Sequence, residues 1–339
     1  MPLSLRAGWE SVLRISSPGA KHLAVSSTGT GELRINGHVA ISECTMTTAR
    51  IGPTTQPPRM QIGDLTVTLL DGGHLWLDGG AMFGIIPKPL WSRRVEVDDA
   101  NRMPLAMTCF LVECDGRRVL IETGSGRLEK YGEKERSIFR LSDHWIGDSL
   151  AAIGVECESI DVVILTHLHF DHAGGGTIPD GHGGYDVTFP RAKYVVQRGE
   201  WEDAVGGYAV MTGTYREENL APLERAGVLS LVDGEAEIVP GVSVLALPGH
   251  TRYQQGVVFS SGDRRVVLPA DMMPTSAHVG LRYNMGYDLL PYENMLNKEK
   301  LLRDVSAGDG HLLLGQDPAD AYWRVTRERG DRYSLTSES

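Results

Sequence analysis

Residues 166–175 (THLHFDHAGG) constrain this chain more than any other stretch, because three histidines and one aspartate fall within six residues. The apolar run before them predicts a short buried strand that ends in a glycine-rich loop. Neutral imidazoles and a carboxylate are ligands for a divalent cation, Zn²⁺ above all, and they are costly to bury without a partner. Side chains two apart on a strand share a face, so His167 and His169 should form one half-site. Asp171 and His172 follow the strand, where the turn can direct them toward a second metal.

Two later strand ends supply further candidate ligands. His250 follows an apolar strand and lies in a Pro-Gly-His-Thr sequence that breaks regular structure, which makes it a third ligand for the first metal. Asp271 ends the apolar run 266–271. A lone carboxylate in that position would lose its hydration, so a cation is its natural partner.

Size and composition limit the classes of protein that this chain can represent. Its 339 residues, 41% of them apolar, are enough for one large domain or two modest ones. A net charge of −11 argues against a nucleic-acid partner, which needs a basic surface. The four cysteines show no CxxC spacing, and no apolar run reaches the roughly 18 residues of a membrane span. These features predict a cytoplasmic protein with a small-molecule substrate and no membrane or nucleic-acid partner; a homodimer is left open.

The chain divides by composition into three segments. Residues 1–60 are rich in Ser, Thr, Gly and Pro and are predicted to form a flexible or partly disordered arm. Residues 61–330 are predicted to form one folded domain, and residues 331–339 a C-terminal tail. Between two early strands, residues 79–91 are apolar but rich in Gly and Pro. We expect no regular element there, and either a plug of the core or a wall of a substrate pocket.

Periodicity and turn signals predict strands in two groups, with helices between and after them. The predicted strands cover 65–70, 107–112, 118–121, 162–165, 192–197, 228–232, 237–239, 242–247, 257–260, 265–268 and, as the final strand, 311–314; the helices cover 141–153, 198–204 and 293–305. The strands at 228–232, 237–239 and 242–247 are expected to form one antiparallel set. The whole pattern predicts two sheets packed face to face and covered by helices.

The spacing of these residues resembles that of the metallo-β-lactamase fold hydrolases. The resemblance rests on His-x-His-x-Asp-His after an apolar strand, a Gly-His about eighty residues later and an Asp about twenty after that. It covers roughly residues 62–323 and implies an α/β (α+β) fold, an αββα sandwich of two mixed β-sheets flanked by helices, with one or two Zn²⁺ ions at its edge. By this resemblance the first metal is held by His167, His169 and His250, the second by Asp171 and His172, and Asp271 bridges them.

Three positions depart from the family pattern. Gln316, in Gly-Gln-Asp-Pro, stands where relatives usually supply a histidine to the second metal. Its neutral amide oxygen is a poorer zinc ligand than imidazole, so Gln316 is a candidate ligand or water-mediated neighbour of a weaker second site, with His311 as the alternative. Gln254 replaces an imidazole that often supports the site. Glu122, where relatives usually carry Asp, could accept a hydrogen bond from a ligand imidazole.

The predicted reaction is hydrolysis by a metal-bound hydroxide. Zn²⁺ with three imidazoles and an open position lowers the pKa of bound water from about 15.7 to about 7. Asp171 is the candidate catalytic residue, placed to orient this water or carry a proton. If the second metal is missing, Tyr283, Tyr287, His278 or Asn284 could polarise the substrate instead.

The expected substrate is a small hydrophobic ester or lactone, because the resemblance favours lactonases and aryl- or phosphotriester hydrolases. Three alternatives remain open. One is hydrolytic dehalogenation of an activated aromatic ring at the same site. Another is a non-catalytic metal-binding or regulatory protein on this scaffold, and the third is a mononuclear iron oxygenase.

Overall fold

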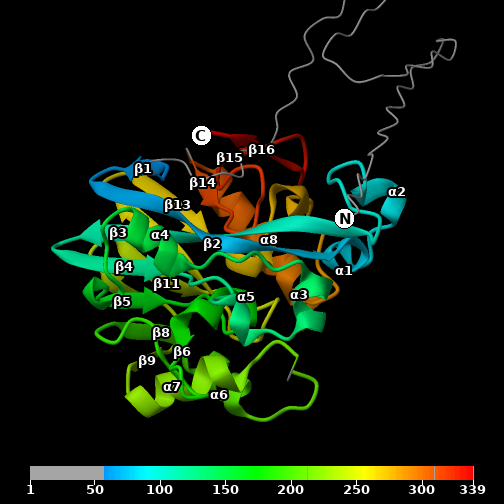
Figure 1. The fold of residues 1–339 in the computed structure, drawn as a ribbon. Coiled ribbons are helices and arrows are strands. Elements are labelled where there is room, and N and C mark those ends of the chain that lie inside the picture. Colours follow the sequence, from blue (N-terminus) through cyan, green and yellow to red (C-terminus); the bar gives the residue numbers. More distant parts are fainter. Residues whose placement is uncertain (1–56, 212, 309, 339) are drawn as a thin grey trace, which may run out of the picture. The chain divides into compact units, whose positions relative to one another are not determined.

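The computed structural model describes residues 57–211, 213–308 and 310–338 (Figure 1). The arm predicted for residues 1–60 therefore lies outside the described residues except at its end, where strand β1 (Arg59–Ile62) begins. In the described part of the chain, no helix is both long and apolar enough to cross a membrane.

Seven strands form the first sheet, in the order β1-β2-β3-β4-β5-β8-β9. They are β1, β2 (Leu65–Asp78), β3 (Arg102–Cys114), β4 (Arg117–Ile121), β5 (Val162–Ile164), β8 (Lys193–Gln197) and β9 (Leu229–Val232). The sheet is antiparallel from β1 to β4 and parallel from β4 to β9. A hairpin joins β3 and β4. Its turn residues Asp115 and Gly116 have φ values of 51° and 73°, and positive φ at both positions is what a type I′ turn requires.

A second sheet of seven strands has the order β10-β11-β12-β13-β14-β15-β16. They are β10 (Ala236–Val239), β11 (Val242–Ala246), β12 (Gln255–Ser261), β13 (Arg264–Leu268), β14 (His311–Leu313), β15 (Tyr322–Arg327) and β16 (Tyr333–Ser337). Only β13 and β14 pair in parallel. The strands β6 (Thr177–Pro179) and β7 (Tyr185–Val187) form a separate hairpin.

Two predictions about strand membership were wrong. Residues 331–339 are not simply a tail, because Tyr333–Ser337 pairs with β15 as the edge of the second sheet, so 311–314 is not the final strand either. Strand β9 does not join β10 and β11; it pairs in parallel with β8 in the first sheet. Alternation along one segment shows that a strand exists, but its partner depends on contacts with distant segments.

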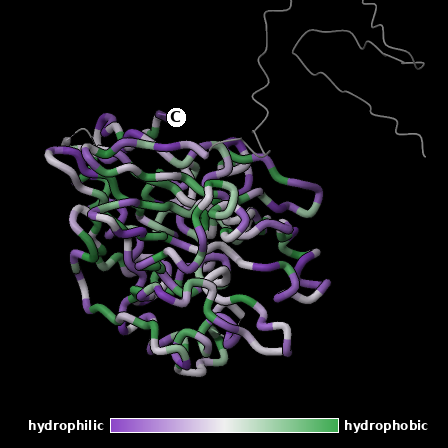
Figure 2. Tube along the Cα trace, turned by 60° about the vertical axis from the view of Figure 1, so that its left-hand side comes forward, coloured by the Kyte–Doolittle hydropathy of each residue, from purple (hydrophilic) through white to green (hydrophobic). Residues whose placement is uncertain are grey.

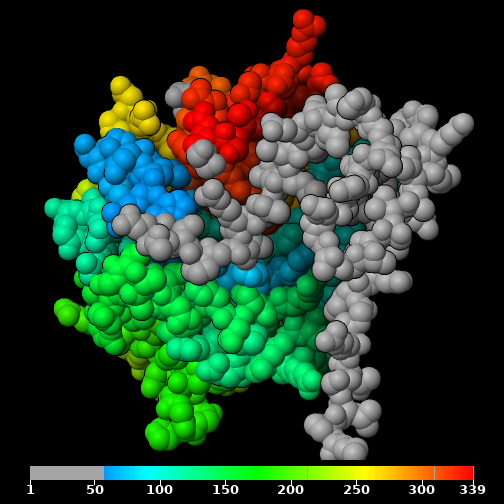
Figure 3. All heavy atoms as spheres, turned by 45° about the horizontal axis from the view of Figure 1, so that its top comes forward, coloured from blue at the N-terminus to red at the C-terminus, as the bar shows by residue number. Residues whose placement is uncertain are grey.

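The core between the sheets receives side chains from both of them. Val67, Phe110 and Ile164 of the first sheet belong to the same buried cluster as Val257 and Val266 of the second. At one side of this core the sheets meet closely: Asp64 N donates to Ser261 Oγ at 2.9 Å, and Figure 3 shows the first strands (blue) beside the residues near 260 (yellow). In Figure 2, hydrophobic segments run through the interior between these layers.

Helices cover the outer faces of both sheets. The first sheet packs against α4 (Ile146–Ala152), α6 (Arg198–Val205) and α7 (Glu217–Ala226), and the second against α8 (Pro291–Ser306). Helix α3 (Glu133–Phe139) lies between β4 and α4 in the sequence. This arrangement confirms the predicted αββα sandwich (Figure 1).

Two local predictions need correction. Residues 79–91 contain two short helices, α1 (Gly79–Phe83) and α2 (Lys88–Trp91), the first capped by Asp78. The predicted helix 141–153 forms only over Ile146–Ala152, and the residues before it lie beside β2, where Ser142 N donates to His74 O at 2.9 Å.

Candidate metal centre

All seven predicted metal-site residues lie in one buried cluster at the ends of strands from both sheets. They follow β5, β11, β13 and β14, and two of them lie in the short helix α5 (Phe170–Ala173). The cluster consists of His167, His169, Asp171, His172, His250, Asp271 and Gln316.

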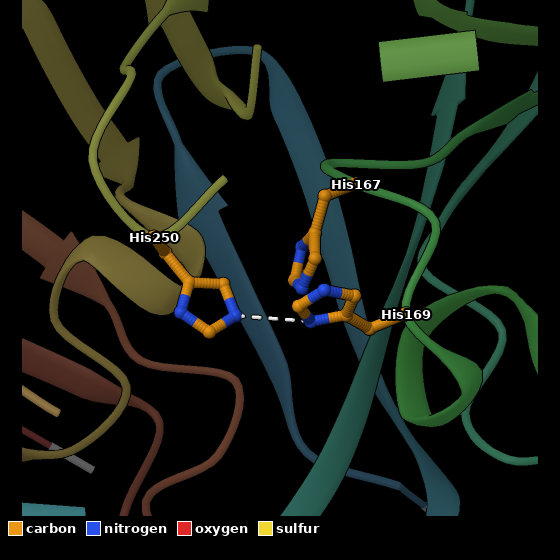
Figure 4. A group of neighbouring side chains, drawn as sticks. All are labelled: His167, His169 and His250. Atoms are coloured by element: carbon orange, nitrogen blue, oxygen red, sulfur yellow. Dashed lines mark hydrogen bonds between the residues drawn. The ribbon is translucent and has the colours of Figure 1, made fainter. Parts of the chain in front are cut away.

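The first group contains the imidazoles of His167, His169 and His250, which point toward one another in Figure 4. One nitrogen from each lies within 4.8 Å of the others. Thr166 Oγ1 lies 3.1 Å from His167 Nδ1, whereas His167 Nε2 is buried and has no hydrogen-bond partner in the described part of the chain. His169 Nδ1 and His250 Nε2 are 3.0 Å apart. Two nitrogens on a tetrahedral zinc ion are separated by about 3.3 Å, so the group fits a single ion.

Asp288 orients His250 and was not singled out from the sequence. His250 Nδ1 lies 3.0 Å from Asp288 Oδ1, and the other Asp288 oxygen accepts hydrogen bonds from Met285 N and Asn294 Nδ2. A carboxylate at Nδ1 leaves the lone pair on Nε2, the nitrogen that faces the cluster. No spacing rule relates His250 to an aspartate 38 residues later, so the sequence held no usable signal.

Glu200 connects the two loops that carry the first group and was also missed. Its buried carboxylate accepts hydrogen bonds from Leu168 N at 3.0 Å, Thr251 Oγ1 at 2.6 Å and Tyr215 Oη at 2.9 Å. Leu168 lies between His167 and His169 in the sequence, and Thr251 follows His250. One side chain on α6 therefore fixes both loops relative to each other.

The second group contains Asp171, His172 and Asp271. His172 Nε2 lies 3.6 Å from Asp171 Oδ2 and 3.3 Å from Asp271 Oδ1. Asp271 also reaches the first group, since its Oδ2 lies 3.5 Å from His250 Nε2. On the far side of the imidazole, His172 Nδ1 lies 3.3 Å from Glu122 Oε1, which matches the role expected of Glu122.

The backbone around the second group is unusual. Glu122 and Ala270, which precedes Asp271, have φ values of 64° and 51°, a region that non-glycine residues seldom adopt. The loop after His172 packs so closely that a Cβ on Gly175 would lie 2.1 Å from Thr123 O. Thr123 also donates to His172 O through its backbone N and its hydroxyl, at 2.9 and 2.7 Å.

The histidines of the cluster differ in their protonation. Burial lowers the pKa of His250, but the hydrogen bond to Asp288 and the charge of Asp271 outweigh it and raise this pKa. Burial lowers the pKa of His167 and of His169 well below the usual value, so both stay neutral, the form that binds a metal. Burial also lowers the pKa of His172, but the carboxylates of Asp271, Glu122 and Asp171 outweigh it and raise this pKa well above normal.

The carboxylates of the second group are shifted in opposite directions. Burial raises the pKa of Asp171. Burial acts in the same sense on Asp271, but the positive charge of His172 prevails and lowers the pKa of Asp271 to about 2. In the absence of a metal, the protonated His172 therefore pairs with the carboxylates around it.

Gln316 reaches the second group, and His311 does not. Gln316 Nε2 lies 2.8 Å from Asp171 Oδ2 and 3.1 Å from His172 Nε2. The ring of His311 stacks on Tyr322 and its Nε2 lies 2.8 Å from Glu338 Oε2. His311 is thus committed to the C-terminal strands, and its assignment as an alternative ligand was wrong.

Most of the other expected polar groups lie outside the cluster. His278 is buried against Phe83 and bonded to Met82 O, Asn284 donates to Pro291 O, and Gln254 donates to Leu247 O. For Tyr287, burial, followed by the charges of Asp78 and Asp171, raises the pKa to about 12.

Comparison with known proteins agrees with this geometry. The family model for the metallo-beta-lactamase superfamily matches residues 103–324, and the chain therefore belongs to that superfamily. This confirms the predicted class, a metal-dependent hydrolase.

Sequence relatives include lactonases and metallo-hydrolases. An N-acyl homoserine lactonase of Bacillus cereus is 28% identical over 178 residues, which cover 50% of this chain and 64% of the relative. The match thus spans less than two thirds of the lactonase. A "probable metallo-hydrolase" of Mycobacterium tuberculosis is 24% identical over 267 residues, covering 70% of this chain and 82% of the relative.

Solved structures share the fold. A "probable metal-dependent hydrolase" from Staphylococcus aureus superposes with a TM-score of 0.75 at 29% identity, covering 83% of this chain and all of that chain. The dizinc quorum-quenching lactonase AidC, solved with a product bound, superposes with a TM-score of 0.70 at 15% identity, covering 84% and 98%. At that identity, the second likeness concerns the fold alone.

Proposed function

We propose that this protein is a zinc-dependent hydrolase of a small hydrophobic ester, with a lactone as the first substrate class to test. The observation that carries the proposal is the convergence of three imidazole nitrogens, one of which is buried without a hydrogen-bond partner in the described chain. His167, His169 and His250 would hold the ion. A zinc ion there would supply acidified water as the nucleophile and a Lewis acid for the carbonyl oxygen.

Asp171 is the residue to which we assign proton transfer. Its burial raises its pKa, which makes its carboxylate a better proton acceptor near neutral pH than an exposed aspartate. Gln316 holds one of its oxygens, so the proton would be held at Asp171 Oδ1. Tyr287, whose pKa is raised by burial and by the charges of Asp78 and Asp171, is a candidate donor to the substrate oxygen.

The preference for a hydrophobic substrate rests on the apolar cluster beside the site. Phe170, directly before Asp171, packs in the same cluster as Met82 and Phe83 of α1. From the same segment, Ile85 and Leu90 remain 77% and 48% exposed. The segment 79–91 thus acts as a core plug through its buried rings, and we propose that its exposed side chains form an apolar wall for the substrate.

The test is a substrate screen on protein of known metal content. Lactones, aryl esters, thioesters, phosphotriesters and chlorinated aromatics would be compared, with His169→Ala as the blank. His182→Ala is the matched control, because His182 is exposed on the β6–β7 hairpin. We expect hydrolysis of a lactone or aryl ester that disappears with chelator, returns with zinc and survives in the control. Activity that persists in His169→Ala would show that the reaction uses another site.

A further inference from the structure

Hydrogen bonds to neighbouring segments fix the backbone of Gln316 and of the residues beside it. Ala106 N donates to Gln316 O at 3.1 Å and Thr108 N donates to Gly315 O at 2.8 Å, so β3 fixes the loop on one side. On the other side, the carboxylate of Asp317 accepts a hydrogen bond from Ser276 N at 2.6 Å. The residue is only 4% exposed. Its side chain is therefore confined to the cluster.

The side-chain amide faces the second group with its nitrogen. Gln316 Nε2 donates to Asp171 Oδ2 at 2.8 Å, and it lies 3.1 Å from His172 Nε2, which is itself a donor when the imidazole is protonated. Turning the amide over would place its oxygen against the carboxylate oxygen of Asp171, acceptor against acceptor. The carboxylate thus fixes the orientation of the amide. The amide oxygen Oε1 is buried and has no hydrogen-bond partner among the described residues.

Little space remains around these groups. A cavity of about 20 Å³ is bordered by Glu122, Asp171, His172, Asp271 and Gln316. That volume holds about one water molecule. A second cation that binds both Asp171 and His172 would have to break the hydrogen bond from Gln316 to Asp171, displace the proton of His172 and accept a neutral oxygen in place of an imidazole.

We propose that Gln316 makes this a one-metal centre, in which its side-chain NH₂ takes the position of a second cation between Asp171 and His172. The amide supplies the partial positive charge that steadies Asp171, while the histidines of the first group hold the only tightly bound ion. Gln316 is a positioning residue that acts through Asp171. This inference rests on the proposed function, because it assumes that the first group binds zinc.

The test is the number of zinc ions per chain in protein equilibrated with excess zinc and then freed of unbound metal. Three proteins are compared by elemental analysis and by the absorption spectrum after cobalt(II) substitution: wild type, Gln316→His and Gln316→Leu. We expect one ion in wild type, two in Gln316→His with an added cobalt band, and one in Gln316→Leu, which removes the amide without adding a ligand. The double variant Gln316→His/His172→Ala should return to one ion.

The outcomes separate the two proposals. Two tightly bound ions in wild type would overturn the role of Gln316 and leave the hydrolase proposal intact. No retained ion in wild type would overturn both. A count that stays at one in a folded Gln316→His variant would also contradict the inference, because an imidazole at this position would then not complete a second site. The wild-type count is decisive by itself if a variant fails to fold.

Discussion

The two halves of the centre are built from similar ligands but are stabilised in opposite ways. In the first half, the imidazoles of His167 and His169 are kept neutral by burial, and a nitrogen of His167 lacks a hydrogen-bond partner within the described structure. In the second half, a positive His172 lies between the carboxylates of Asp171, Asp271 and Glu122. A cation would satisfy the free lone pair of His167 in the first half, whereas in the second half the protonated His172 already pairs with the neighbouring carboxylates.

The supporting residues explain this difference. Asp288 and Glu200 act behind the first half, where they fix the tautomer of His250 and the spacing of the two ligand loops. Behind the second half, Glu122 contacts His172 and Gln316 contacts both Asp171 and His172. The residues behind the first half orient its ligands toward a metal. The residues behind the second half contact the side chains of its ligands directly.

The largest expected effect is a difference in metal content and activity between two variants, each of which lacks one imidazole from one half. His167→Ala should lose the ion and lower hydrolysis by about 10³-fold or more, since the metal contributes several kcal/mol to the transition state. His172→Ala should keep one ion per chain, because its imidazole belongs to the other half. Elemental analysis and kcat/KM on the same samples check both. Equal loss of metal in the two variants would remove the distinction between the halves.

Asp288→Asn tests how His250 is oriented. Replacing this carboxylate should weaken zinc binding by about 10–100-fold, because the tautomer with Nε2 facing the ion is no longer favoured. Zinc affinity would be measured by competition with a chromophoric chelator. Asp143→Asn, at an exposed aspartate, is the control. Unchanged affinity in Asp288→Asn would mean that His250 is oriented by its backbone alone.

Glu200→Gln and Glu122→Gln compare the residues that hold the ligands of the two halves in place. Glu200→Gln places an NH₂ group among three donors and should cost about 1–3 kcal/mol in the free energy of unfolding and weaken the first ion. Glu122→Gln should leave the affinity of the first ion unchanged, because Glu122 contacts His172. Chemical denaturation and zinc competition measure the two effects. A weaker first ion in Glu122→Gln would show that the halves are coupled.

A pH effect of smaller size comes from Lys298, which lies behind the first half. Burial lowers its pKa to about 7, and its Nζ donates to Tyr283 O, His278 O and Asn284 Oδ1. Between pH 7 and the usual value of 10.5, the folded protein binds fewer protons than the unfolded chain. The contribution of Lys298 to the free energy of unfolding should therefore rise with pH across this window, by at most about 1.4 kcal/mol per pH unit, and stay constant below it.

Lys298→Met should remove that rise, as measured by denaturation of metal-free protein at several pH values. Lys300→Met on the exposed side of the same helix is the control and should keep the wild-type slope. A slope in Lys298→Met equal to that of wild type would show that Lys298 does not titrate in this window.

The sequence was informative where local spacing determines geometry. The positions of His167, His169, Asp171 and His172 follow from one strand end and one helical turn, so their proximity could be predicted from residues 166–175. The ends of later strands also placed His250 and Asp271 at the same edge. The family resemblance placed Gln316, and the structure added the direction in which its amide points.

The missed features depend on contacts between distant segments. Asp288 reaches His250, and Glu200 reaches Leu168 and Thr251, across separations that no periodicity records. Strand β16 was missed for the same reason, because its short polar sequence is ordered by pairing with β15. Such elements are stabilised by their neighbours rather than by their own pattern.

The most direct test of the central claim is a zinc titration of metal-free wild-type protein in which hydrolysis of the best substrate from the screen is followed. A single ion held by His167, His169 and His250 predicts that activity rises linearly and reaches its plateau at one equivalent of zinc per chain. Activity that continues to rise to two equivalents, or that does not respond to zinc, would contradict the account.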